Sequence, residues 1–90
     1  MSQTTPPPTH RERTKCVRYL VVLQALGQVL AYTMQQEGVP ATTAESWHVY
    51  YDQLVLKSMT CKPTELAGIG TALGNSLKTA LWYIRKAEDQ

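Results

Sequence analysis

Two cysteines and two histidines are the side chains of this sequence that could act as nucleophiles or metal ligands. Cys16 and Cys61 lie far apart and form no C-x-x-C motif, and together with His10 and His48 they match no zinc-ligand spacing. We therefore expect no metal ion and no redox motif. Two reduced, buried thiols in a cytoplasmic protein are the simplest interpretation of this pattern.

A second chemical feature is the pair His48 and Asp52, which lie four residues apart in a predicted helix. This spacing allows a hydrogen-bonded pair, but pairs of this kind usually support the helix that carries them. The sequence holds no phosphate-binding loop, no pair of catalytic carboxylates and no activated cysteine motif. We expect no catalytic residues, no cofactor and no enzymatic activity.

Charge is concentrated near the start of the chain. The net charge of the 90 residues is +2, and Glu12 alone opposes a basic cluster made of Arg11, Arg13, Lys15 and Arg18. Positive charge at a helix N-terminus opposes the helix dipole, so an acidic partner surface, nucleic acid or solvent must offset it. The remainder is close to neutral, unlike the basic face of a dedicated nucleic-acid binder.

The segment that follows the basic cluster could be mistaken for a membrane anchor, because residues 19–36 contain no charged side chain. Several glutamines interrupt it, and it falls short of the roughly 20 apolar residues that a membrane span needs. We expect no contact with a membrane.

The hydrophobic periodicity predicts an all-α fold with helices at about 10–37, 43–58 and 63–88, after a disordered, proline-containing tail at 1–9. Gly38 and Pro40 favour the end of the first helix, residues 42–45 resemble a capping box that starts the second, and Pro63 suits the first turn of the third. These elements predict a three-helix up-down-up bundle, or a helical hairpin with a shorter middle helix, in an oligomer. In the bundle Cys16 and Cys61 would lie at the same end.

Residues 65–86 allow two interpretations. The run L-G-N-S-L-K-T-A (73–80) resembles the turn and second helix of a helix-turn-helix motif. This resemblance implies a transcriptional regulator in which Ser76 caps the second helix, and in which Ser76, Lys78, Arg85 and Lys86 contact DNA.

The alternative for these residues is one continuous helix. A stripe of apolar and small residues runs through Gly74 without a break, in alternating steps of four and three: Leu66, Gly70, Leu73, Leu77, Ala80, Ile84 and Ala87. Asn75 is polar where a helix-turn-helix needs an apolar side chain. We therefore favour the continuous helix, with Gly68, Gly70 and Gly74 packed closely against a neighbouring backbone such as that at Gly27.

Apolar side chains exceed what one core of this size can hold, which indicates a protein interface. The candidate interface residues are Val17, Val21, Tyr32, Val49, Leu56, Leu77, Leu81 and Trp82. We predict a small non-enzymatic interaction module that forms homo-oligomers and binds a protein partner, with the basic cluster guiding the approach. Regulators, chaperones and inhibitors, including phage- and plasmid-encoded ones, are the classes that fit; a DNA-binding regulator is the alternative.

Overall fold

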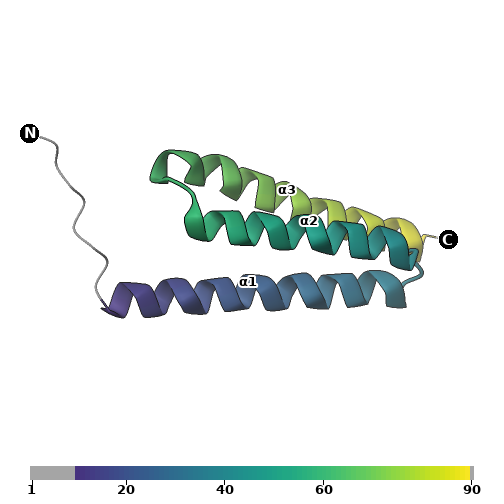
Figure 1. Cartoon of the computed structure of the whole chain (residues 1–90). Coiled ribbons are helices and arrows are strands. Elements are labelled where there is room, and N and C mark those ends of the chain that lie inside the picture. The colour runs from purple at the N-terminus through teal and green to yellow at the C-terminus, as the bar shows by residue number, and fades with distance from the viewer. Residues whose placement is uncertain (1–9, 90) are drawn as a thin grey trace, which may run out of the picture.

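Three helices make up the described part of the chain: α1 (His10–Gln36), α2 (Ala41–Thr60) and α3 (Pro63–Glu88). The computed structural model describes the backbone of residues 10–89 and the side chains of residues 18–89, so the tail predicted at 1–9 lies outside it. The helices pack side by side, with the links 37–40 and 61–62 at opposite ends of the molecule (Figure 1). The predicted all-α fold is confirmed, and residues 10–89 include no strand.

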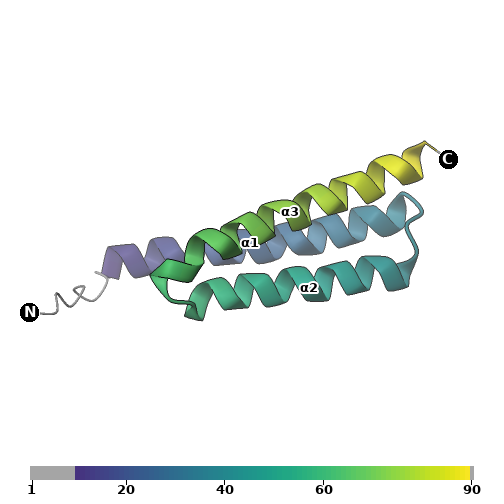
Figure 2. The ribbon, with the colours of Figure 1, turned by 90° about the horizontal axis from the view of Figure 1, so that it is seen from above.

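The first turns of α1 extend past the link between α2 and α3, as the two views in Figures 1 and 2 show. Because no other helix accompanies them there, the backbone that carries the basic cluster projects from one end of the bundle. Arg18, the last member of this cluster, is exposed. The side chains of Arg11, Arg13 and Lys15 lie outside the described side chains.

The end of α1 follows the prediction. Gly38 has a φ of 101°, a left-handed conformation that glycine adopts without steric cost. The N–H of Val39 then donates to the carbonyl of Met34 at 2.9 Å, and the Val39 side chain is buried. Chain reversal and core packing are therefore coupled at this link.

The start of α2 differs from the prediction. The helix begins at Ala41, before the predicted capping box, because the Pro40 carbonyl accepts the first helical hydrogen bond from Ala44 N–H at 3.0 Å. Thr42 therefore lies inside the first turn and caps nothing, so the capping box at 42–45 is wrong. A capping contact occurs instead at the start of α3, where Lys62 N–H donates to Glu65 Oε2 at 3.4 Å.

The backbone of α3 runs from Pro63 to Glu88 without a turn, which confirms the continuous helix. The helix-turn-helix alternative needed a break at Gly74 followed by a second helix capped by Ser76. Ser76 is instead buried in the middle of α3, and its carbonyl accepts a hydrogen bond from Trp47 of α2. The supposed recognition helix is thus part of the core, and residues 65–86 lack the geometry that the motif requires.

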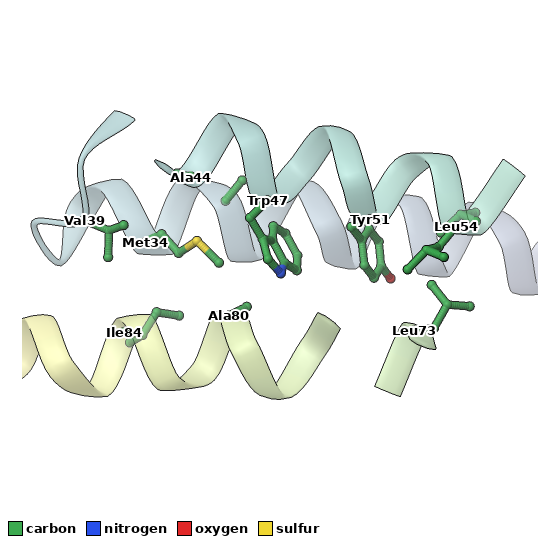
Figure 3. Close-up of a cluster of buried hydrophobic side chains, with 11 residues drawn as sticks. Met34, Val39, Ala44, Trp47, Tyr51, Leu54, Leu73, Ala80 and Ile84 are labelled. Carbon is green, nitrogen blue, oxygen red and sulfur yellow. The ribbon is translucent and has the colours of Figure 1, made fainter. Parts of the chain in front are cut away.

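The core lies between the three helices and takes more of its buried side chains from α2 than from either of the other helices (Figure 3). Its members are Ala31, Met34, Val39, Ala44, Trp47, Tyr51, Leu54, Val55, Leu73, Ala80 and Ile84. On α2 the core face includes Trp47, Tyr51 and Leu54, whereas Tyr50 is exposed. In α3 the predicted stripe is buried or half-buried from Leu73 onward, but Leu66 and Gly70 are exposed.

Two stacked aromatic rings join α2 to both neighbours. Trp47 and Tyr51 lie one turn apart on the same face, with ring centroids 5.0 Å apart. Trp47 Nε1–H donates to the Ser76 carbonyl of α3 at 2.7 Å, and the Tyr51 hydroxyl donates to the Leu23 carbonyl of α1 at 2.7 Å. Each buried polar atom of the two rings therefore has a partner on a different helix, which fixes how all three helices pack.

Tyr51 should also make stability depend on pH in the alkaline range. Burial, and to a lesser extent the Asp52 carboxylate, raises the pKa of Tyr51 above its usual 10.0. The folded chain thus keeps this phenol neutral at a pH where the unfolded chain has ionised it. Its contribution to stability is fully present below about pH 10 and is lost as pH rises through the raised pKa.

We expect Tyr51→Phe to lower the free energy of unfolding by about 1 kcal/mol at neutral pH, because the hydrogen bond to Leu23 is lost. The wild type should then lose stability more steeply than this variant above about pH 10, so the two values converge. Urea denaturation followed by circular dichroism at several pH values measures both. If the free energy of unfolding fell equally with pH in the two proteins, the prediction would be wrong.

Glycine packing also differs from the prediction. A Cβ placed on Gly27 would lie 2.6 Å from Cδ1 and Cε1 of Tyr51, so α1 does approach another helix closely at this point. The neighbour is a ring on α2, however, and not the glycines of α3. A Cβ placed on Gly68, Gly70 or Gly74 would have no other atom within 4 Å, so the predicted close packing of these three is wrong.

Candidate interaction surfaces

The described side chains that could act as nucleophiles or metal ligands do not form a reactive site. His48 Nε2 lies 3.5 Å from Asp52 Oδ2 but forms no hydrogen bond with it, so the two side chains are close without making the hydrogen-bonded pair that the spacing allows. They lie on the side of α2 that faces Gly27 of α1. Cys61 is a half-buried free thiol whose Sγ lies 3.8 Å from the Ser58 carbonyl, and the side chain of Cys16 is outside the described side chains. Among the described side chains, those of residues 18–89, no three His, Cys, Asp or Glu residues gather as metal ligands would.

The outward side of α1 carries the most regular apolar surface. The inner seam of α1, which packs on the core, consists of Leu20, Leu23, Gly27, Leu30 and Met34. A second set, which we call the outer seam, repeats the same spacing two residues later: Val22, Ala25, Val29 and Tyr32. Two residues correspond to about 200° around a helix, so the two seams lie on opposite sides.

Every member of the outer seam is exposed, and the exposed fraction of the residue is 64% for Val22, 59% for Val29 and 65% for Tyr32. Val21 is exposed beside them, and no charged residue occurs between Arg18 and Glu37. An exposed apolar seam about 15 Å long, within an uncharged stretch of about 27 Å, is unusual on the free surface of a monomer.

An apolar hollow lies at the end of the bundle where α1 projects. This end groove has a volume of about 490 Å³ and is open to solvent. All three helices contribute to its lining: Tyr19, Leu20 and Leu23 from α1, Ser58 and Met59 from α2, and Leu66, Gly70 and Leu73 from α3. The exposed Arg18 lies next to Tyr19 in the chain, so basic charge adjoins the groove.

The outward sides of α2 and α3 carry smaller apolar patches. On α2, Val49 and Leu56 are exposed together with Tyr50 and Met59. On α3, Leu81 and Trp82 are exposed, with the Trp82 ring in edge contact with Tyr83 and the Nζ of Lys86 4.9 Å from its centroid. A tryptophan that is half-exposed and stacked by a cation is the kind of residue that anchors protein interfaces.

Most predicted interface residues that can be placed are exposed: Val21, Tyr32, Val49, Leu56, Leu81 and Trp82. Leu77 is the exception, because it is half-buried and packs against the core. Val17 lies outside the described side chains. Of the residues proposed to contact DNA, Lys78, Arg85 and Lys86 are exposed, whereas Ser76 is buried.

Sequence reasoning missed the outer seam as a unit, although it named Val21 and Tyr32 on that side of α1. Val22, Ala25 and Val29 are not among the predicted interface residues. The signal was present in their alternating steps of three and four, but the inner seam has the same period in the same helix. Periodicity alone therefore shows two candidate faces, and burial decides which of them is the core.

These features define a small all-α protein, a bundle of three packed helices whose exposed apolar faces are its main candidate sites. In residues 10–89, none of the helices has the length and apolar character needed to cross a membrane. No protein-family model, no curated protein and no solved structure matches the chain.

Proposed function

We propose that this chain is a small, non-enzymatic interaction module, of regulator, chaperone or inhibitor type, built as an up-down-up bundle. It self-associates and binds a protein partner through apolar helix faces, and the basic cluster at the start of α1 guides the approach. A cytoplasmic location fits Cys61, which is a free thiol in the described part of the chain.

One observation carries this proposal: large apolar side chains are exposed on the outer sides of all three helices while the core between them is already filled. They include Val22 and Tyr32 on α1, Val49 on α2, and Leu81 and Trp82 on α3. Isolated exposed apolar residues are normal, but adjacent ones in stripes mark interaction surfaces. The DNA-binding alternative has no comparable support, because α3 contains no turn.

Two measurements on the full chain test the proposal. Sedimentation equilibrium over a wide concentration range should show a reversible oligomer. In cells that express the chain, a photo-crosslinking amino acid in place of Trp82 should yield adducts of discrete mass. The same amino acid in place of the exposed, polar Asn75 should yield far fewer adducts. A chain that stays monomeric and gives no adduct specific to Trp82 would contradict the proposed function.

A further inference from the structure

The outer seam of α1 has the spacing of a helix-pairing surface but no helix covers it. Its members Val22, Ala25, Val29 and Tyr32 recur in steps of three, four and three, the spacing that packs one helix against another along a shared seam. The inner seam shows what this spacing does in the same helix, since it is the one packed against the core. All three described helices are already placed in the bundle and none of them covers the outer seam, so we consider a helix of another molecule as its cover.

The chemistry of the outer seam favours a second copy of this chain as that molecule. From Tyr19 to Gln36 the strip carries no charge, so it meets its own copy without like-charge repulsion. Gln24, Gln28 and Gln35 flank the seam and are exposed. Because an amide side chain both donates and accepts, each of these residues can bond to a glutamine of the other copy. Such a self-complementary face is what a twofold-symmetric dimer requires.

Charges at the two ends of the strip define the orientation. Arg18 is exposed at its beginning and Glu37 at its end. If the helices ran parallel, Arg18 would face its own copy, and the rest of the basic cluster would follow it. If they run antiparallel, Val22 meets Tyr32, Ala25 meets Val29, and Arg18 comes opposite the segment that contains Glu37. The basic start of each helix then also lies beside the negative end of the other helix dipole.

We propose that two copies of this chain form a dimer through antiparallel packing of their α1 outer seams, with Arg18 of each copy beside Glu37 of the other. This assignment rests on the self-association in the proposed function and specifies its surface and orientation. It leaves the end groove and the outer sides of α2 and α3 free for a different partner. A single helix pair about 27 Å long is smaller than the standard interface of about 800 Å² per partner, so a dissociation constant in the micromolar range is expected.

The first test compares two valines of matched exposure. Val29 in the outer seam is 59% exposed, and Val49 on the outer side of α2 is 51% exposed. Val29→Asp places two carboxylates in the dimer interface and should weaken dimerisation about a hundredfold, whereas Val49→Asp should leave it within about threefold of wild type. Sedimentation equilibrium measures the dimer. Circular dichroism and urea denaturation show that each variant remains folded, and Val22→Lys provides a second variant of opposite charge.

The second test determines the orientation. Arg18→Glu alone and Glu37→Arg alone each create a like-charge pair at both ends of an antiparallel dimer, and each should weaken it about three- to tenfold at low salt. The double variant Arg18→Glu/Glu37→Arg should restore the wild-type dissociation constant. In a parallel dimer, each residue faces its own copy, so the single changes would have no effect and there would be nothing to restore.

The outcomes separate this inference from the proposed function. A dimer that survives Val29→Asp and dissociates on Val49→Asp overturns the inference and leaves self-association in place. Single charge reversals without effect overturn the antiparallel orientation. A wild-type chain that stays monomeric at every concentration overturns both the dimer and the self-association. Dissociation by Val29→Asp, together with recovery in the charge-reversed double variant, supports the dimer as described.

Discussion

Replacing Trp47 with alanine should lower the free energy of unfolding by about 3–5 kcal/mol, a loss at the upper end of what truncating a buried side chain costs. The change removes a buried ring that stacks on Tyr51, and it also removes the N–H that bonds to the Ser76 carbonyl at 2.7 Å. Small domains commonly have only 5–15 kcal/mol of stability, so a measurable fraction of the variant should be unfolded at 37 °C.

The chain provides its own control for this substitution. Trp82, the other of its two tryptophans, is 52% exposed and makes no hydrogen bond to another helix within the described part of the chain. We expect Trp82→Ala to change the free energy of unfolding by no more than about 0.5 kcal/mol. Urea denaturation should be performed at one fixed protein concentration, because self-association would otherwise shift the midpoints. Equal losses for the two alanine variants would contradict the structure of the core.

Replacing Gly27 with alanine should destabilise the protein by about 1–3 kcal/mol, although alanine is the better helix former. The added Cβ would lie 2.6 Å from two atoms of the Tyr51 ring. That ring has no room to retreat, because it is fully buried, stacks on Trp47 and is bonded through its hydroxyl to Leu23. To relieve the contact, α1 and α2 must therefore move apart.

Gly68 is the matched control for Gly27. It also lies inside a helix, but a Cβ at this position would meet no atom within 4 Å. Gly68→Ala should therefore stabilise the protein by about 0.5–1 kcal/mol, which is the difference in helix propensity alone. In thermal or urea denaturation, the midpoint should fall for Gly27→Ala and rise for Gly68→Ala, relative to the wild type. A stabilising Gly27→Ala would show that the ring and helix are less tightly packed than described.

The two predictions concern one structural unit. Tyr51 is the residue that Gly27 makes room for, and Trp47 is the ring against which Tyr51 stacks. Together they position α1 relative to α2 and α3, and this packing turns the outer seam of α1 away from the core. Substitutions here should consequently affect any surface that depends on the orientation of α1, whereas changes at Val29 should affect dimerisation without loss of folding.

Helix number and approximate position follow from the sequence because they depend on local rules. Apolar periodicity of three and four residues requires a helix whatever packs against it. Gly38 ends α1 because glycine tolerates a positive φ, and Pro63 fits the first turn of α3. The unbroken stripe through Gly74 likewise favoured a continuous helix, although residues 73–80 resemble a helix-turn-helix motif.

Other features were decided only by tertiary structure, since they depend on which surfaces meet. α2 begins at Ala41, earlier than the capping pattern at Thr42 predicted, because the Pro40 carbonyl accepts the first helical hydrogen bond. The glycines of α3 matched a close-packing pattern but face open space, while Gly27 meets a ring from a helix that no local rule places beside it.

The same distinction applies to the candidate sites. The sequence by itself determined that α1 carries an uncharged, apolar stretch with helical period, and that basic residues precede it. It also placed Val21 and Tyr32 of that helix among the interface residues, but periodicity alone does not separate the two seams, because both have the same spacing. That choice depends on the ring of Tyr51, which needs a glycine opposite it, and only the inner seam offers one, at Gly27. Packing therefore buries the inner seam and exposes Val22, Ala25, Val29 and Tyr32.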